Sequence, residues 1–145
     1  MLTDLIAASP TEAEAIVKAA GLEEGWPILP AKSVDQIKLS SLALLLDGMA
    51  LSTTAVVEYS RSFRLLADGG DMGPWVVSVP TNLVGGLAGL QDERINEIAQ
   101  SWTSTAELKR DRWSVAKASE FLNELKRFAT AAREGRRELL LRIAL

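Results

Sequence analysis

The sequence predicts a single, mainly α-helical domain over residues 1–145, a bundle of five to six helices with at most a small two-stranded β pairing of residues 75–79 with 138–143. Three observations predict this class. Apolar residues recur at helical spacing along most of the chain, capping motifs precede two of these stretches, and only one segment has a strong strand composition. A chain of this length can bury enough surface to fold as one cooperative unit.

The first helix signal is the motif Ser9-Pro10-Thr11-Glu12. The Ser9 hydroxyl can cap the helix, Glu12 can reach back to the Ser9 amide, and proline suits the first helical position. An apolar stripe over 13–20 follows, and Gly21 is a plausible left-handed stop. We expect residues 3–8 to add one or two helical turns before it.

Residues 25–30 read Gly-Trp-Pro-Ile-Leu-Pro, and the two prolines predict a stiff, non-helical connector. It carries Trp26, Ile28 and Leu29. One interpretation is a strap that covers the core. The alternative is an exposed apolar surface that binds a partner, which makes these three residues interaction candidates.

A second capping box at 33–36 opens a helix that extends to Leu46 and ends at Asp47-Gly48. Its leucines point in nearly every direction, which is typical of a helix enclosed by its neighbours. Residues 53–57 have strand propensity, but Val56, Tyr59 and Phe63 continue at helical spacing. We therefore expect a helix over 53–67, followed by a Gly-rich turn over 68–74.

Residues 75–79, bounded by two prolines, form the best strand candidate. A strand needs a pairing partner, and the alternating segment 138–143 is the best available one; the alternative for that segment is a C-terminal helix. Three more helices are expected over 81–90, 92–108 and 114–134. The hydroxyl-rich residues 101–105 are interpreted as ending the second of these by competing for its backbone hydrogen bonds.

The composition excludes several kinds of chemistry. The chain has no His and no Cys, so it has no Ser-His triad, no thiol nucleophile, no disulfide and none of the usual zinc or haem ligands. No cofactor is expected. The start Met1-Leu2-Thr3-Asp4 does not resemble a secretion signal, and the uncharged run 39–46 is too short to span a membrane. We expect a soluble, cytoplasmic protein without membrane association.

Acidic residues on two neighbouring helices raise the alternative of a divalent-metal carboxylate enzyme. The residues of this set are Asp92, Glu93, Asn96, Glu97, Glu120, Asn123 and Glu124. Their pattern weakly resembles the magnesium site of the all-α nucleotide pyrophosphohydrolases, which place Glu-Glu-x-x-Glu on one helix and Glu-x-x-Asp on its partner. The resemblance implies that Asp92, Glu93 and Asn96 take the first set and Glu120 and Asn123 the second, to hold Mg²⁺ against nucleotide phosphates. The candidate metal ligands of this alternative are Asp92, Glu93, Glu97, Glu120 and Glu124. The chain departs from the pattern where asparagine replaces two carboxylates, and helical periodicity turns Glu93, Glu97 and Glu120 toward solvent.

The charge is unevenly distributed along the chain. Residues 1–108 contain 6 basic and 14 acidic side chains, a net charge of −8, whereas residues 109–145 contain 10 basic and 5 acidic side chains, a net charge of +5. A second alternative is therefore nucleic-acid association through the basic C-terminal segment, at Arg133, Arg136 and Arg137. The overall isoelectric point near 5.1 disfavours it, and a basic helix packed on an acidic body is the simpler interpretation.

The leading functional prediction is a non-catalytic protein-interaction or self-associating domain, in a short helical chain that resembles many small bacterial proteins. No credible set of catalytic residues is present, and several of the four tryptophans stand beside prolines or at element ends, where interface anchors often lie. Trp113 joins Trp26 and the three arginines as an interaction candidate. The expected partner is another protein or a second copy of the chain.

Overall fold

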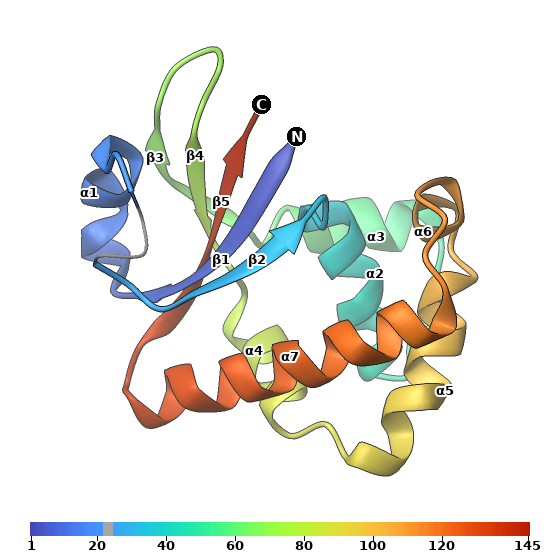
Figure 1. Ribbon diagram of the computed structural model, residues 1–145. Helices are drawn as coiled ribbons and strands as arrows, with labels where there is room; N and C mark the ends of the chain where they lie inside the picture. Colours follow the sequence, from blue (N-terminus) through green and yellow to red (C-terminus); the bar gives the residue numbers. More distant parts are fainter. Residues whose placement is uncertain (22–24) are drawn as a thin grey trace.

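The chain folds as an α+β domain, so the prediction of a mainly α-helical, all-α protein with one two-stranded pairing is wrong. The computed structural model describes residues 1–21 and 25–145. Within these ranges it contains seven α-helices, one short 3-10 helix and a five-stranded sheet (Figure 1). Three strands that the sequence reading did not identify account for the difference.

The sheet has the strand order β2-β1-β5-β4-β3, and all neighbouring strands are antiparallel. Its strands are β1 (Leu2–Ala8), β2 (Ile28–Lys32), β3 (Arg64–Asp68), β4 (Trp75–Ser78) and β5 (Glu138–Ala144). The two segments expected as the only strands do pair, with Trp75 opposite Ile143 and Val77 opposite Leu141. They form the middle of a larger sheet, in which β5 lies between β4 and the first strand of the chain (Figure 1).

The helices lie on both sides of this sheet in unequal number. They are the 3-10 helix η1 (Pro10–Glu12), α1 (Ala13–Lys18), α2 (Gln36–Leu46), α3 (Thr53–Ser60), α4 (Thr81–Ala88), α5 (Asp92–Thr103), α6 (Ala106–Arg110) and α7 (Val115–Glu134). The long helix α7 crosses one face, together with α2, α4 and α5, whereas α1 lies apart from them beside β3 and β4 (Figure 1).

Two separate hydrophobic cores result, one on each face of the sheet. The larger joins Leu5 of β1 and Leu141 of β5 to the apolar faces of the helices, for example through Leu42 of α2 and Leu125 of α7. The smaller packs Ile6, Ala8, Val76 and Leu140 against Ala13 and Ile16 of α1. Because neighbouring residues of β1 and β5 are buried in opposite cores, both strands are central and covered on both faces.

The expected helical turns over residues 3–8 are a strand for this reason. A strand buried on both faces is apolar throughout, so the alternation that identifies a half-exposed strand is missing. The connector over 25–30 also changes character, because β2 begins at Ile28 and pairs antiparallel with β1. Pro30 is tolerated there since β2 is an edge strand, where a missing amide hydrogen costs no ladder bond.

The helix expected over 53–67 ends early, and the remainder of that segment is β3. The hydroxyls of Ser60 and Ser62 donate to the carbonyls of Val57 and Tyr59, at 2.6 Å each, and so compete with continuation of the helix. The helix expected over 92–108 is likewise divided into α5 and α6, where Thr105 donates its hydroxyl to the Trp102 carbonyl at 2.6 Å.

Other local predictions are confirmed. Ser9 and Glu12 form the expected capping box, with proline in the first turn. The turn over 68–74 connects β3 to β4, and the long C-terminal helix spans 115–134 as expected. The second capping motif differs in detail, because Asp35 rather than Ser33 caps α2 by accepting from the Lys38 amide at 3.0 Å.

Candidate functional site

An apolar cleft is formed by α2, α3, the loop between them, the end of α5 and the start of α6. It encloses about 380 Å³. Its apolar lining consists of Ile37, Leu51, Val56, Val57 and Ala106. Its polar lining consists of Ser41, Ser52, Thr53, Ser101, Ser104, Thr105 and the single charged residue Glu107. Although more polar than apolar residues contribute, most of the lining surface is apolar. A cleft of this size with a mainly apolar surface and a few polar groups is typical of binding sites.

Helix α3 forms the most exposed wall of the cleft. None of its eight residues is buried, although its sequence Thr-Thr-Ala-Val-Val-Glu-Tyr-Ser is rich in apolar and β-branched residues. Val57 is 41% exposed, and in the preceding loop Met49 is 56% and Leu51 is 38% exposed. Leu51 and Val57 belong to the apolar lining and Met49 lies two residues before Leu51 in the same loop, and exposed apolar side chains gathered in this way mark interaction sites.

The hydroxyl groups of the cleft are mostly engaged by backbone. Ser41 donates to the Lys38 carbonyl at 2.9 Å, Ser104 donates to the Gln100 carbonyl at 2.9 Å, and Ser52 caps α3 by accepting from the Ala55 amide at 3.0 Å. In the described part of the chain, no cleft hydroxyl is hydrogen-bonded to a side chain that could accept its proton. The arrangement therefore offers hydrogen bonds to a ligand, and it lacks the nucleophile–base pair that hydroxyl catalysis needs.

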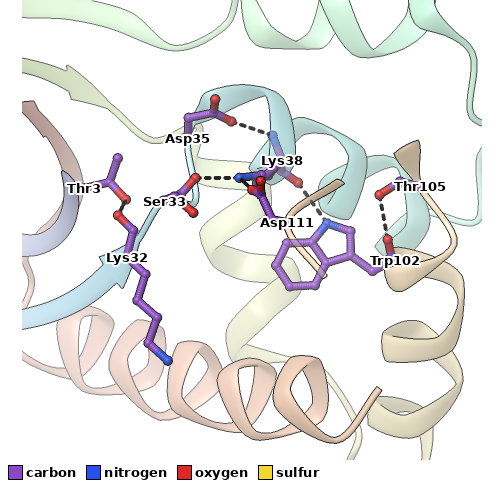
Figure 2. A network of polar contacts seen from close by, with 8 residues as sticks. All are labelled: Thr3, Lys32, Ser33, Asp35, Lys38, Trp102, Thr105 and Asp111. Carbon is purple, nitrogen blue, oxygen red and sulfur yellow. Dashed lines mark hydrogen bonds and ion pairs between the residues drawn. The ribbon is translucent and has the colours of Figure 1, made fainter. Parts of the chain in front are cut away.

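Behind the cleft, a polar network fixes α2, α5 and α6 to one another (Figure 2). The indole N–H of Trp102, which is fully buried, donates to the Lys38 carbonyl at 3.1 Å. The hydroxyl of Thr105 in turn donates to the Trp102 carbonyl. Two residues of the cleft lining are thereby connected to Trp102. Thr105 hydrogen-bonds to its carbonyl, and Ser41 donates to the same Lys38 carbonyl as its indole N–H does. The network gives the cleft a fixed floor.

Lys38 is the most unusual charged residue of the molecule, because it is only 6% exposed. Its ammonium group donates to the carboxylate of Asp111 and, at 2.8 Å, to the carbonyl of Ser33 (Figure 2). The hydrogen bond from Lys38 lowers the pKa of Asp111 from its ordinary value, and partial burial opposes this shift. The pair joins the start of α2 to the turn between α6 and α7, and we interpret it as structural because neither residue lines the cleft described above.

The acidic residues of the metal-enzyme alternative lie on α5 and α7, which pack side by side. Asp92 forms an ion pair with Lys126 at 2.9 Å, and Glu93 and Glu97 are exposed. Among residues 1–21 and 25–145, no group of three or more acidic side chains is close enough to hold a metal ion. On α7, Glu120 is exposed and Glu124 is half-buried, and neither is part of such a group.

The structure separates the interaction candidates. Trp26 and Ile28 are half-buried against the smaller core, where the Trp26 indole N–H donates to Glu12 at 2.9 Å, and Leu29 packs against the larger core. Trp113 is 6% exposed and packs edge-on against Phe121, with ring centroids 5.6 Å apart.

The basic candidates lie elsewhere, at the end of α7. Arg133, Arg136 and Arg137 are exposed, and Arg133 and Arg137 line a second hollow of about 230 Å³ together with Thr81 at the start of α4 and Glu138. Two arginines and a glutamate therefore share this hollow, so its positive charge is partly offset. The site that the sequence did not reveal is the cleft beside α3, whose lining comes from three separate stretches of the chain, 37–41, 51–57 and 101–107, without a shared motif.

Fold and site together define an antiparallel α+β domain with an open apolar cleft and no assembled catalytic group in its described part. Comparison of the chain with protein-family models, with curated proteins and with solved structures finds no match. The function therefore has to be argued from the cleft itself. Among the described residues, no helix is both long enough and apolar enough to cross a membrane.

Proposed function

We propose that the chain is a non-catalytic protein-interaction domain, and that the cleft beside α3 receives an apolar side chain from a segment of a partner protein. One observation supports this proposal above the others: α3 is rich in apolar residues and has no buried residue. An amphipathic helix in a domain of this kind normally buries one face. The partner would supply the missing cover.

The openness of the cleft to solvent favours a peptide segment over a small molecule. Leu51 and Val57 line the hollow and Met49 lies beyond its lining, so an occupant confined to the hollow would leave Met49 uncovered, and a longer segment is needed to contact these three residues together. A segment that lies along α3 would cover them, in the manner of an apolar anchor flanked by shallower contacts.

Selection from a displayed library of random 12-residue peptides tests the proposal. The protein is compared with Val57→Asp, which places a charge in the cleft wall, and with Met72→Asp, a matched change at a loop residue that is 71% exposed. Both substitutions are at exposed positions, so we expect both variants to fold. We expect peptide families that bind the wild type and Met72→Asp but not Val57→Asp.

Two results would overturn the proposal. One is the absence of any enriched family whose binding depends on Val57. The other is a concentration-dependent dimer, seen by light scattering after size exclusion, that Val57→Asp dissociates, because the occupant would then be a second copy of the chain.

A further inference from the structure

Resting on the proposed function, we infer that the partner segment is basic and places a lysine or arginine side chain against Glu107, next to its apolar anchor. Glu107 is the only charged residue that lines the cleft, and it is half-buried there. Its carboxylate makes no hydrogen bond or ion pair within the part of the chain that the structure describes. A partly desolvated carboxylate without a partner gains more from an added cation than a fully hydrated one does.

Three further acidic residues stand near lining residues in the chain, although none of the three lines the cleft itself. Glu58 follows Val57 on α3, Glu97 precedes the cleft residue Ser101 by one helical turn on α5, and Asp47 ends α2. Lys38, the single base of α2, is buried against Asp111 and is thus not available to neutralise them. On α6, Lys109 and Arg110 follow Glu107 but do not line the cleft.

The sequence places the whole site in the acidic part of the chain. Every residue that lines the cleft lies between positions 37 and 107, within the stretch 1–108 that carries a net charge of −8. Glu107, the charged residue of the lining, attracts a partner segment of the opposite sign and disfavours an acidic one. An acidic partner segment would place a second negative charge beside Glu107, with no cation among the described lining residues to offset the repulsion. This charge complementarity favours a basic amphipathic segment as the occupant.

The unpaired hydroxyls add geometric support. Neither Thr53 nor Ser101 donates or accepts a side-chain hydrogen bond among the described residues, and both line the same cleft as Glu107. An ammonium or guanidinium group offers several donors, of which one can be taken by the carboxylate and the others by hydroxyl oxygens. An aliphatic side chain beside it would then contact Leu51, Val56 and Val57.

The peptides selected on the wild type supply the probe for this inference. We expect lysine and arginine to outnumber aspartate and glutamate beside their apolar anchor. Fluorescence polarisation then measures their Kd for the wild type, Glu107→Gln and Glu107→Lys, with Glu14→Lys as a control. Glu14 is an exposed residue of α1, which lies on the other face of the sheet from the cleft. Glu14→Lys therefore changes the net charge of the protein as much as Glu107→Lys does, but away from the cleft.

We expect Glu107→Gln to weaken binding about threefold to tenfold and Glu107→Lys by about tenfold or more, with little change in Glu14→Lys. Replacing the basic residue of the peptide with glutamate should reverse the order, so that Glu107→Lys binds the altered peptide better than the wild type does. Peptides that depend on Val57 but bind Glu107→Lys as tightly as the wild type would overturn this inference and leave the proposed function standing. Absence of any Val57-dependent peptide would overturn both.

Discussion

Replacement of Trp102 with phenylalanine tests whether the cleft floor is fixed as the structure indicates. The tryptophan is fully buried between α2, α5 and α7 and stacks on Phe121, with ring centroids 6.4 Å apart. The smaller ring leaves roughly 40 Å³ unfilled, which at about 24 cal/mol per Å³ costs about 1 kcal/mol. Loss of the indole N–H bond to the Lys38 carbonyl adds about 0.5–1 kcal/mol. That carbonyl keeps its bond from Ser41, so no additional penalty for an unpaired acceptor is expected.

The expected loss is therefore about 1.5–2 kcal/mol in the free energy of unfolding, or roughly 5 °C in Tm. Urea unfolding followed by circular dichroism measures it, because a change in tryptophan content would complicate a fluorescence signal. Trp75→Phe is the matched control: Trp75 is half-exposed and its indole N–H makes no hydrogen bond within the described residues, so a loss under about 0.5 kcal/mol is expected there. Equal losses in the two variants, or no loss in Trp102→Phe, would refute the reasoning.

Three further outcomes are expected. The Ser9 amide and the Trp26 indole lower the pKa of Glu12 from its ordinary value of 4.5, and Lys38 lowers the pKa of Asp111 from its ordinary value of 3.8. Each ionised carboxylate therefore stabilises the folded protein fully at a pH above its ordinary pKa, and this stabilisation is lost as the pH falls below that value. Glu12→Gln and Asp111→Asn should each flatten the decline of urea midpoints between about pH 5 and pH 3, and an unchanged decline would contradict this. Gly69→Ala should destabilise by about 2 kcal/mol or more in thermal unfolding because its Cβ would clash with the Pro74 carbonyl, whereas Gly25→Ala, with open space around it, should not. In hydrogen exchange the amides of α3 should be less protected than those of α7, and equal protection would contradict its lack of buried residues.

The helical layer could be predicted from the sequence because its signals are local. Capping residues, apolar spacing and the Gly-rich turn each lie within a few positions of the structure they specify. α7, for example, buries Phe121, Leu122 and Leu125 on the face that their spacing indicates. The strand over 138–144 could be recognised because Leu139 and Leu141 alternate with Glu138 and Arg142, even though Leu140 is buried in the opposite core.

The strand over 75–79 could also be recognised, but the other three strands could not be predicted, since their signals are non-local. β1 is covered on both faces, and only the presence of α1 on one side and α7 on the other explains why Leu5, Ile6 and Ala7 are all buried. β3 is an edge strand whose apolar residues continue the helical spacing of α3, so nothing within the segment distinguishes the two. The cleft is subject to the same limit, because the fold rather than any motif brings Val57 and Glu107 together.

The two walls of the cleft differ in how firmly they are held, and this difference bears on what the cleft can bind. The wall made by α2, α5 and α6 is fixed by Trp102 and by the ion pair of the buried Lys38 with Asp111. The wall made by α3 has no buried residue and is anchored mainly through Tyr59, which packs edge-on against Phe63 and donates to Asn82 at 2.9 Å. An occupant that covers Val57 would thus bury apolar surface on the weakly held wall while resting on the rigid one. Because no residue of α3 is buried, covering its apolar side chains is what the proposed interaction function requires of a partner segment.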